Sequence, residues 1–193
     1  MGIILFFMKK RFLSLMLFMS LTIMANSQNW KGNASAGFGL LNTKIRLQYE
    51  MPITKQFSVG ANANYYLINW KGFIVEPFAR VYGKNGNEEG FFGQFKIGYG
   101  NLSTVDVLYA DLYENTRSSV FGGGLGMGYK FLIGNHFTIE PYFGTRFYTT
   151  PIYEYKSSVD SWESLGNDIG SGIGWFMTTG LPIEFNWKVG YQF

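Results

Sequence analysis

The residues that could do chemistry are few, because the chain of 193 residues contains one histidine and no cysteine. A histidine works in acid–base or nucleophilic catalysis when a serine or an acid is placed to pair with it. His136 follows Asn135 in a short polar segment with no such pairing visible, which indicates a structural role in a turn. A transition-metal site needs several His or Cys ligands. The sequence therefore predicts no catalytic residues, no metal site and no cofactor.

Acidic residues in the last long loop are a further candidate for a ligand site. Carboxylates bind Ca²⁺ well, but a calcium loop requires them at fixed positions. The spacing of the three acids matches no such loop: Asp160, Glu163 and Asp168. We expect a solvated acidic surface there.

The glycine-rich segment GGGLGMG at residues 122–128 suggests a phosphate-binding loop at first sight. It matches neither the GxGxxG nor the GxxxxGK pattern. In a strand, its alternate glycines would face one side. There they would make room for bulky neighbours such as Tyr142 and Arg146, so we predict a structural role.

The overall composition excludes several classes of protein. Charged residues make up 15% and aromatic residues 19% of the chain, whereas soluble domains carry about 25% charged residues on average. This apolar content excludes a disordered chain and disfavours an ordinary cytosolic enzyme. Three of the 16 basic residues lie in the first 27 residues, which contain no acid, so the remaining 13 balance the 13 acids. A nucleic-acid partner, which requires a basic face, is not expected.

The first 27 residues are organised like a secretory signal peptide. Met8-Lys9-Lys10-Arg11 is a positive region, Phe12–Met24 is apolar, and Ala25-Asn26-Ser27 supplies small residues before a cleavage site after Ser27. A start at Met1 or at Met8 is compatible with this leader. A membrane anchor is the alternative, but about 13 apolar residues fall short of the roughly 20 that a spanning helix needs. The mature domain is then residues 28–193.

Alternating polarity dominates the mature chain. In Lys44–Met51, for example, Ile45, Leu47 and Tyr49 fall on one face of a strand and the polar residues between them on the other. For the first strand, a bulge at Leu41-Asn42 within one long strand is the alternative, but it would leave an odd number of strands, unlike bacterial barrels. We expect eight strands, the other seven being near Gly32–Leu40 and at Phe57–Leu67, Phe73–Val81, Phe91–Tyr99, Phe121–Phe131, Phe137–Phe147 and Leu181–Phe193.

The charged residues of these strands fall on the face opposite the apolar one: Lys44, Arg46, Glu50, Glu76, Arg80, Lys96, Lys130, Glu140, Arg146, Glu184 and Lys188. A soluble barrel would be apolar inside, whereas a membrane barrel is apolar outside and polar inside. Aromatic residues near the strand ends, where membrane barrels have interfacial girdles, favour the membrane barrel: Tyr49, Phe57, Tyr99, Tyr129, Phe137, Trp187 and Tyr191. The charged residues would then form a network in the lumen, with carboxylates and guanidinium groups bridging neighbouring strands.

The connections differ in length at the two ends of the predicted barrel. One rim has short polar turns, at Thr54–Gln56, Lys84–Glu89 and Gly134–His136. The other rim has two long loops, Leu102–Ser119 and Pro151–Gly180. This arrangement is typical of outer-membrane barrels, whose turns lie in the periplasm and whose loops lie outside.

Two similar segments, IVEPF at 74–78 and TIEPY at 138–142, place a proline at an outward position of a strand. Proline cannot donate to the ladder. We therefore expect a local bulge or kink at Pro77 and at Pro141.

The C-terminal segment WKVGYQF ends an alternating strand on an aromatic residue. It resembles the terminal signal by which the barrel-assembly machinery recognises outer-membrane proteins, with the assembly signal carried by Trp187, Tyr191 and Phe193. Together with the leader and the Gly-Tyr pairs at 98–99, 128–129 and 190–191, it makes the chain similar to the small eight-stranded OmpA/OmpX-type barrels. More narrowly, the chain resembles the single-barrel outer-membrane proteins of Bacteroidetes-type bacteria, over roughly residues 30–193.

This resemblance implies an all-β fold, an eight-stranded antiparallel up-and-down transmembrane β-barrel in the bacterial outer membrane, preceded by a cleaved signal peptide. It implies a monomer whose partners are outer-membrane lipids, the barrel-assembly machinery and periplasmic chaperones. We predict a non-enzymatic role in the envelope, or in contacts with an extracellular partner through the long loops.

Two alternatives stay open at this point, a narrow pore for small solutes and a lipid-modifying barrel enzyme. Lipid-modifying enzymes of this fold use a histidine and a serine near the outer rim. The corresponding rim of this chain has no histidine, only serines: Ser118, Ser119, Ser157, Ser158 and Ser161.

Overall fold

The structure is a computed structural model that describes residues 32–41, 43–67, 70–84, 88–104, 113–115, 117–150, 154–155, 173, 175–176 and 180–193. The predicted signal peptide, three of the rim serines (Ser157, Ser158 and Ser161) and the three loop acids lie outside these residues. Within the described residues, no helix is long and apolar enough to cross a membrane.

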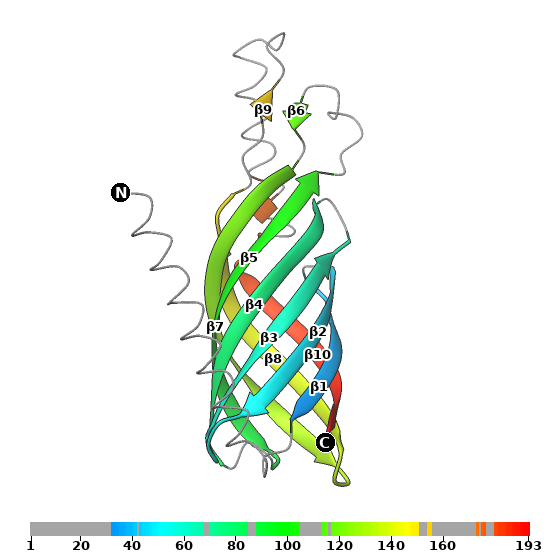
Figure 1. Ribbon diagram of the computed structural model, residues 1–193, viewed down its shortest axis with the longest axis vertical. Coiled ribbons are helices and arrows are strands. Elements are labelled where there is room, and N and C mark those ends of the chain that lie inside the picture. The colour runs from blue at the N-terminus through cyan, green and yellow to red at the C-terminus, as the bar shows by residue number, and fades with distance from the viewer. Residues whose placement is uncertain are drawn as a thin grey trace, which may run out of the picture.

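Eight antiparallel strands form a closed barrel (Figure 1). β1 pairs with β2 on one side and with β10 on the other, which closes the sheet and confirms the predicted eight-stranded antiparallel barrel. A second sheet of two short strands, which the sequence did not predict, lies beyond one rim and pairs β6 (Tyr113–Asn115) with β9 (Glu154–Tyr155). The barrel strands are β1 (Asn33–Gly39), β2 (Lys44–Pro52), β3 (Phe57–Tyr66), β4 (Trp70–Tyr82), β5 (Gly90–Thr104), β7 (Arg117–Ile133), β8 (Phe137–Tyr148) and β10 (Ile183–Gln192).

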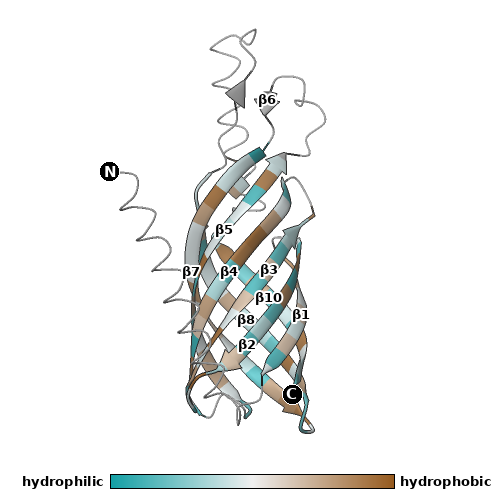
Figure 2. Ribbon diagram, viewed as in Figure 1, coloured by the Kyte–Doolittle hydropathy of each residue, from teal (hydrophilic) through white to brown (hydrophobic). Residues whose placement is uncertain are grey.

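The two faces of the barrel wall differ sharply in polarity. Leu47 is 60% exposed on the outer face, whereas the neighbouring Arg46 and Gln48 are buried inside. The same alternation recurs along the other strands, so polar and apolar bands succeed one another in Figure 2. Large apolar side chains are exposed on all eight barrel strands, for example Phe38, Leu47, Tyr65, Val81, Phe95, Met127, Phe143 and Val189.

β1 and β2 form a hairpin, and Gly39 pairs with Lys44 across a turn in which Thr43 has a φ of 42°. The first strand is therefore separate, as predicted, and not part of a longer bulged strand. At the end of the barrel that carries the C-terminus, the lower end in Figure 1, short turns at 53–56 and 134–136 join β2 to β3 and β7 to β8.

β5 and β7 extend further towards the other rim, the loop rim, than the sequence indicated. The predicted loop Leu102–Ser119 begins and ends within strand, because Leu102 pairs with Ser118. Here the polarity of the wall is reversed: Leu102 and Val120 are buried inside, and Asn101 and Ser119 are exposed. The prediction required apolar residues outside, and therefore ended both strands too early.

The two strand prolines interrupt the ladder without shifting it. β4 and β5 pair at Val75–Tyr99 and again at Phe78–Lys96 in the same register, so Pro77 adds no extra residue to its strand. Pro141 interrupts the β7–β8 ladder in the same way, between Gly128–Tyr142 and Phe131–Ile139. Of the expected bulge or kink, no bulge occurs at either proline, because the pairing resumes in the same register. At Pro141 a shallow apolar groove of about 200 Å³ lies on the outer face, with Met127 and Phe143 in its lining.

Candidate functional site

All eleven charged side chains assigned to the lumen are buried inside the barrel. They divide into two groups along the barrel axis. The upper charge cluster lies nearer the loop rim and contains Lys44, Arg46, Glu76, Lys96, Arg146 and Glu184. The lower charge cluster lies nearer the short turns and contains Glu50, Arg80, Lys130, Glu140 and Lys188.

A single carboxylate, that of Glu184 on β10, organises the upper charge cluster. Its Oε2 lies 3.0 Å from Nζ of Lys44 and 2.7 Å from Nζ of Lys96, and its Oε1 lies 3.0 Å from Nη2 of Arg46. Nε of Arg146 lies 3.8 Å from Oε2. Four basic side chains from three strands therefore surround one acid.

Glu76 on β4 is the second acid of the upper charge cluster. Its Oε2 lies 2.9 Å from Nη2 of Arg46, and its Oε1 lies 3.2 Å from Nζ of Lys96. The hydroxyl of Tyr148 donates to its Oε1 at 2.8 Å. Across the barrel, Nη1 of Arg146 donates to the hydroxyl of Tyr66.

The lower charge cluster is organised by a base, Arg80 on β4. Its Nη1 lies 2.5 Å from Oε2 of Glu50 and 3.1 Å from Oε2 of Glu140. Its Nε donates to Gln94 at 2.7 Å and its Nη2 to Gln48 at 3.1 Å. Each of the three guanidinium nitrogens therefore has a partner, and the guanidinium carbon lies 4.1 Å from the ring centroid of Phe92.

Lys188 and Lys130 complete the lower charge cluster. Nζ of Lys188 lies 2.8 Å from Oε2 of Glu140 and donates to Gln48 at 3.0 Å. Nζ of Lys130 donates to Gln192 at 3.2 Å. Glu50 also accepts hydrogen bonds from Tyr82 and Ser58, two groups that the charge pattern alone did not assign to the network.

The expectation that these groups bridge neighbouring strands is wrong for most of them. Six of the nine ion pairs among the described residues join strands that are not adjacent in the barrel, such as Arg80 on β4 with Glu140 on β8. The physical reason is the width of the interior, which in an eight-stranded barrel is just filled by side chains. Four of these six pairs skip one strand, whereas Arg80–Glu140 and Lys96–Glu184 skip two and cross the interior.

The glycines of β7 line one wall of this interior, as predicted. A Cβ at Gly126 would lie 2.5 Å from Cζ of Tyr142, and a Cβ at Gly124 would lie 3.1 Å from Cβ of Arg146. The side chains of Tyr142 and Arg146 occupy the space that these glycines leave. Tyr66, Tyr82 and Tyr142 are likewise buried in the interior.

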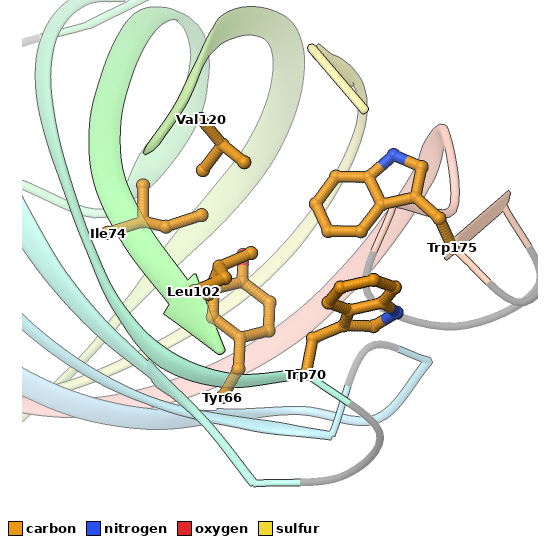
Figure 3. Packing of buried hydrophobic residues seen from close by; sticks show 6 residues of the cluster. All are labelled: Tyr66, Trp70, Ile74, Leu102, Val120 and Trp175. Atoms are coloured by element: carbon orange, nitrogen blue, oxygen red, sulfur yellow. The ribbon is translucent and has the colours of Figure 1, made fainter. Parts of the chain in front are cut away.

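A cluster of buried apolar residues, the apolar cap, lies in the interior near the loop rim, and the sequence did not predict it. It consists of Tyr66, Trp70, Ile74, Leu102, Val120 and Trp175 (Figure 3). The rings of Trp70 and Trp175 meet edge to face, with centroids 5.8 Å apart. Gly180 donates its backbone N–H to the carbonyl of Trp175 at 2.7 Å. Trp70 and Ile74 continue the period of two on the inner face of β4, whereas no pattern in the sequence indicated that Trp175 folds into the barrel.

The predicted assembly-signal residues lie along the last strand and beyond it. Trp187, Tyr191 and Phe193 are all exposed on the outside. The turn of His136 holds the strand end: its carbonyl accepts from the N–H of Gln192 at 2.7 Å, and its Nδ1 donates to the Gln192 carbonyl at 3.0 Å. Its ring stacks on Tyr191 with centroids 5.2 Å apart.

The arrangement of the described residues is that of a densely ion-paired and hydrogen-bonded interior. Within these residues, no group of three or more His, Asp or Glu side chains could hold a metal ion. Ser119 at the loop rim donates to Asn101 at 2.9 Å and accepts from Tyr99 at 3.3 Å, so both of its roles are met by uncharged partners.

A family model described as a protein of unknown function, DUF3575, matches residues 11–168, which is most of the chain. The chain belongs to this family. The matched part of the DUF3575 chain includes seven of the eight barrel strands and ends before β10. No curated protein matches the sequence.

Among solved structures, the DUF3575 chain is similar to the N-terminal β-barrel domain of OprF from Pseudomonas aeruginosa. The TM-score is 0.55, and the match covers 85% of this chain and 96% of that domain at 8% sequence identity. At this identity the likeness shows the fold alone, and it extends over almost the whole of the OprF barrel.

Proposed function

We propose that this chain is an integral outer-membrane β-barrel that is exported with its leader removed, is closed to solutes, and acts without catalysis in the cell envelope. The single observation that carries the proposal is the inside-out polarity of the wall. Large apolar side chains are exposed on every barrel strand, and eleven charged side chains are buried within.

This polarity is the reverse of what water favours. Soluble monomers rarely expose contiguous apolar patches of more than a few hundred Å², whereas a lipid bilayer requires such a surface around the whole barrel. A closed barrel also leaves no unpaired strand edge, which is the condition for crossing hydrocarbon with strands. The similarity in fold to the OprF barrel also supports a membrane barrel over a soluble one.

The contents of the interior support a closed barrel over a pore. Two charge clusters and the apolar cap follow one another along the axis, and ion pairs cross the lumen in both clusters. A solute path would have to break several buried ion pairs, and leaving one partner of such a pair alone costs about 3 to 5 kcal/mol.

The loop rim is then the part of the protein available for outside contacts. The pairing of β6 with β9 joins the connection that follows β5 to the one that follows β8. We propose that these connections carry any surface interaction. The relation to single-barrel proteins of Bacteroidetes-type bacteria and the monomeric state remain predictions.

The test is fractionation of cells that produce the full chain, combined with electrophoresis of unheated and boiled samples. An outer-membrane barrel is expected in the outer-membrane fraction, with a band that changes mobility on boiling because the folded barrel resists detergent. A band in the soluble periplasmic fraction with the same mobility before and after boiling would refute the proposal.

A further inference from the structure

We propose that the barrel interior binds one small monovalent inorganic anion, of the halide class, between the two charge clusters beside Gln48 and Gln94. The inference concerns only the interior, and so it does not depend on where the barrel resides.

The first observation is an excess of buried positive charge. Among the described residues, seven basic side chains and four carboxylates are buried in the barrel: Lys44, Arg46, Arg80, Lys96, Lys130, Arg146 and Lys188 against Glu50, Glu76, Glu140 and Glu184. A surplus of positive over negative charge among these described side chains is costly to bury, because the interior solvates ions far less well than water. Water molecules can solvate these groups but cannot balance their charge, whereas an anion does both.

The second observation is a set of buried donors without an acceptor. Within the part of the chain that the structure describes, Nε2 of Gln48, Nε2 of Gln94 and the hydroxyl of Tyr142 have no hydrogen-bond partner. The three residues are 4%, 3% and 1% exposed. Buried polar groups are nearly always satisfied in native proteins, so these donors indicate a missing acceptor.

The local geometry explains why the two glutamines present donors. Both amide oxygens are already used by Arg80, with Nε donating to Gln94 at 2.7 Å and Nη2 donating to Gln48 at 3.1 Å. The oxygen of Gln48 also accepts from Lys188 at 3.0 Å. Arg80 thereby fixes the orientation of each amide, so that the oxygen faces the cation and the NH₂ group remains without an acceptor.

Tyr142 marks the level of the site along the barrel axis. Its ring centroid lies 5.7 Å from Nζ of Lys96 in the upper charge cluster and 5.7 Å from Nζ of Lys188 in the lower one. Amide and hydroxyl donors in an interior that holds both of these ammonium groups suit an anion and would repel a cation. The unpaired amide oxygens of Asn62 and Asn186 belong instead to residues whose Nδ2 donates to Glu76 and Glu184.

The same surroundings limit the size and charge of the anion. An eight-stranded interior is just wide enough for side chains to fill, and aromatic rings occupy this level, with Phe92 and Tyr142 stacked 6.5 Å apart. Glu50 and Glu140 on the far side of Arg80 would repel a second negative charge. A chloride or bromide ion meets both limits better than a phosphate.

The experiment measures the unfolding midpoint of the purified full-length mature barrel, refolded in chloride, bromide or gluconate at equal ionic strength. Gluconate is too large for the site and controls for general salt effects. A ligand that binds only the folded state raises the folding constant by a factor of 1 + [L]/Kd, about elevenfold at ten times Kd. We expect a saturable rise in the midpoint with chloride and bromide and none with gluconate.

Gln48→Glu is the diagnostic variant, because a carboxylate there still accepts from Arg80 and Lys188, supplies negative charge and removes the unpaired NH₂ group. We expect this barrel to lose its halide dependence, whereas Gln56→Glu, the same change in an exposed turn, should keep it. Gln94→Glu makes the same test from the facing strand if the first variant fails to fold.

Crystals of the barrel grown or soaked in bromide locate the ion by anomalous scattering. The expected result is a bromide peak within hydrogen-bond distance of Nε2 of Gln48 or of Gln94. Equal midpoints in halide and gluconate, together with no bromide peak in the lumen, would overturn the proposal. Halide dependence that survives in both glutamate variants would overturn this location of the site.

Discussion

Nζ of Lys96 on β5 lies 2.7 Å from Oε2 of Glu184 on β10, although β7 and β8 separate these strands along the barrel wall. The contact therefore crosses the interior. Together with the pair of Arg80 and Glu140 lower down, it fastens opposite walls to each other. The strand ladder holds the wall together around the circumference, and these ion pairs hold it together across the diameter.

Replacing Glu184 with Gln should destabilise the barrel strongly, because Lys44, Arg46, Lys96 and Arg146 would all lose their shared carboxylate. Removing one partner of a buried ion pair costs about 3 to 5 kcal/mol. Urea titration, followed by the loss of the folded band on unheated gels, measures the change. Glu89→Gln at the opposite rim is the control, because Glu89 is exposed and, among the described residues, its side chain accepts one hydrogen bond, from Tyr129. A loss of under about 1 kcal/mol is expected there, and equal losses in the two variants would contradict the role of Glu184.

The glycine wall of β7 predicts a steric result. Gly126→Ala places a Cβ 2.5 Å from Cζ of Tyr142, whereas a Cβ at Gly93 on the outer face meets no atom within 4 Å. Overpacking a filled interior costs about 1 to 3 kcal/mol, so Gly126→Ala should lower the unfolding midpoint and Gly93→Ala should not. In a barrel that already carries Tyr142→Leu, Gly126→Ala should lower the unfolding midpoint by less than it does in the wild-type barrel. If Gly126→Ala lowers the midpoint equally with and without Tyr142→Leu, the alanine and the tyrosine do not compete for this space.

Neither the wild-type barrel nor the Trp175→Ala variant should conduct ions. Trp175 contributes to the cap, but both charge clusters lie below it and remain in the variant. Planar bilayer recordings provide the measurement. Stable single-channel conductance that is abolished by changing Arg80 or Arg146 would contradict a closed interior and restore the pore as the function.

Deleting Phe193 should slow assembly in cells without weakening the folded barrel. Its side chain is 61% exposed, and its backbone N–H makes one hydrogen bond, to the carbonyl of Gly32. We expect precursor or degraded protein in cells but a nearly normal unfolding midpoint for material refolded in detergent. Phe193→Tyr, which keeps an aromatic end, is the control for assembly. Normal amounts of folded barrel from the deleted chain would remove the assembly role of this residue.

The two-residue period in polarity predicted most of the fold because the barrel wall has one apolar and one polar face along almost its whole height. Leu47 and Gln48 lie on the faces that the pattern indicated. The rule failed where its premise changed. At the loop rim, Leu102 and Val120 point inward and Ser119 is exposed, so the pattern predicted a loop where the strands continue.

The members of the lumen network could be predicted from the sequence, but their partners could not. Alternation identifies Arg80 and Glu140 as inward residues, yet their contact depends on the tilt and closure of the barrel, which bring β4 and β8 face to face. The position of Trp175 could not be predicted for a different reason. It belongs to no strand, and only its packing against Trp70 defines its place.

The most direct test is the depth of individual side chains in a lipid bilayer. The chain contains no cysteine, so Leu47→Cys, Ile97→Cys and Gln56→Cys can each carry one fluorescent label on a barrel reconstituted into vesicles. Leu47 and Ile97 are exposed on the outer wall, and Gln56 is exposed in a turn. Lipids brominated in the middle of their acyl chains should quench the labels at 47 and 97 strongly and the label at 56 weakly. Equal, weak quenching at all three positions would contradict a membrane barrel.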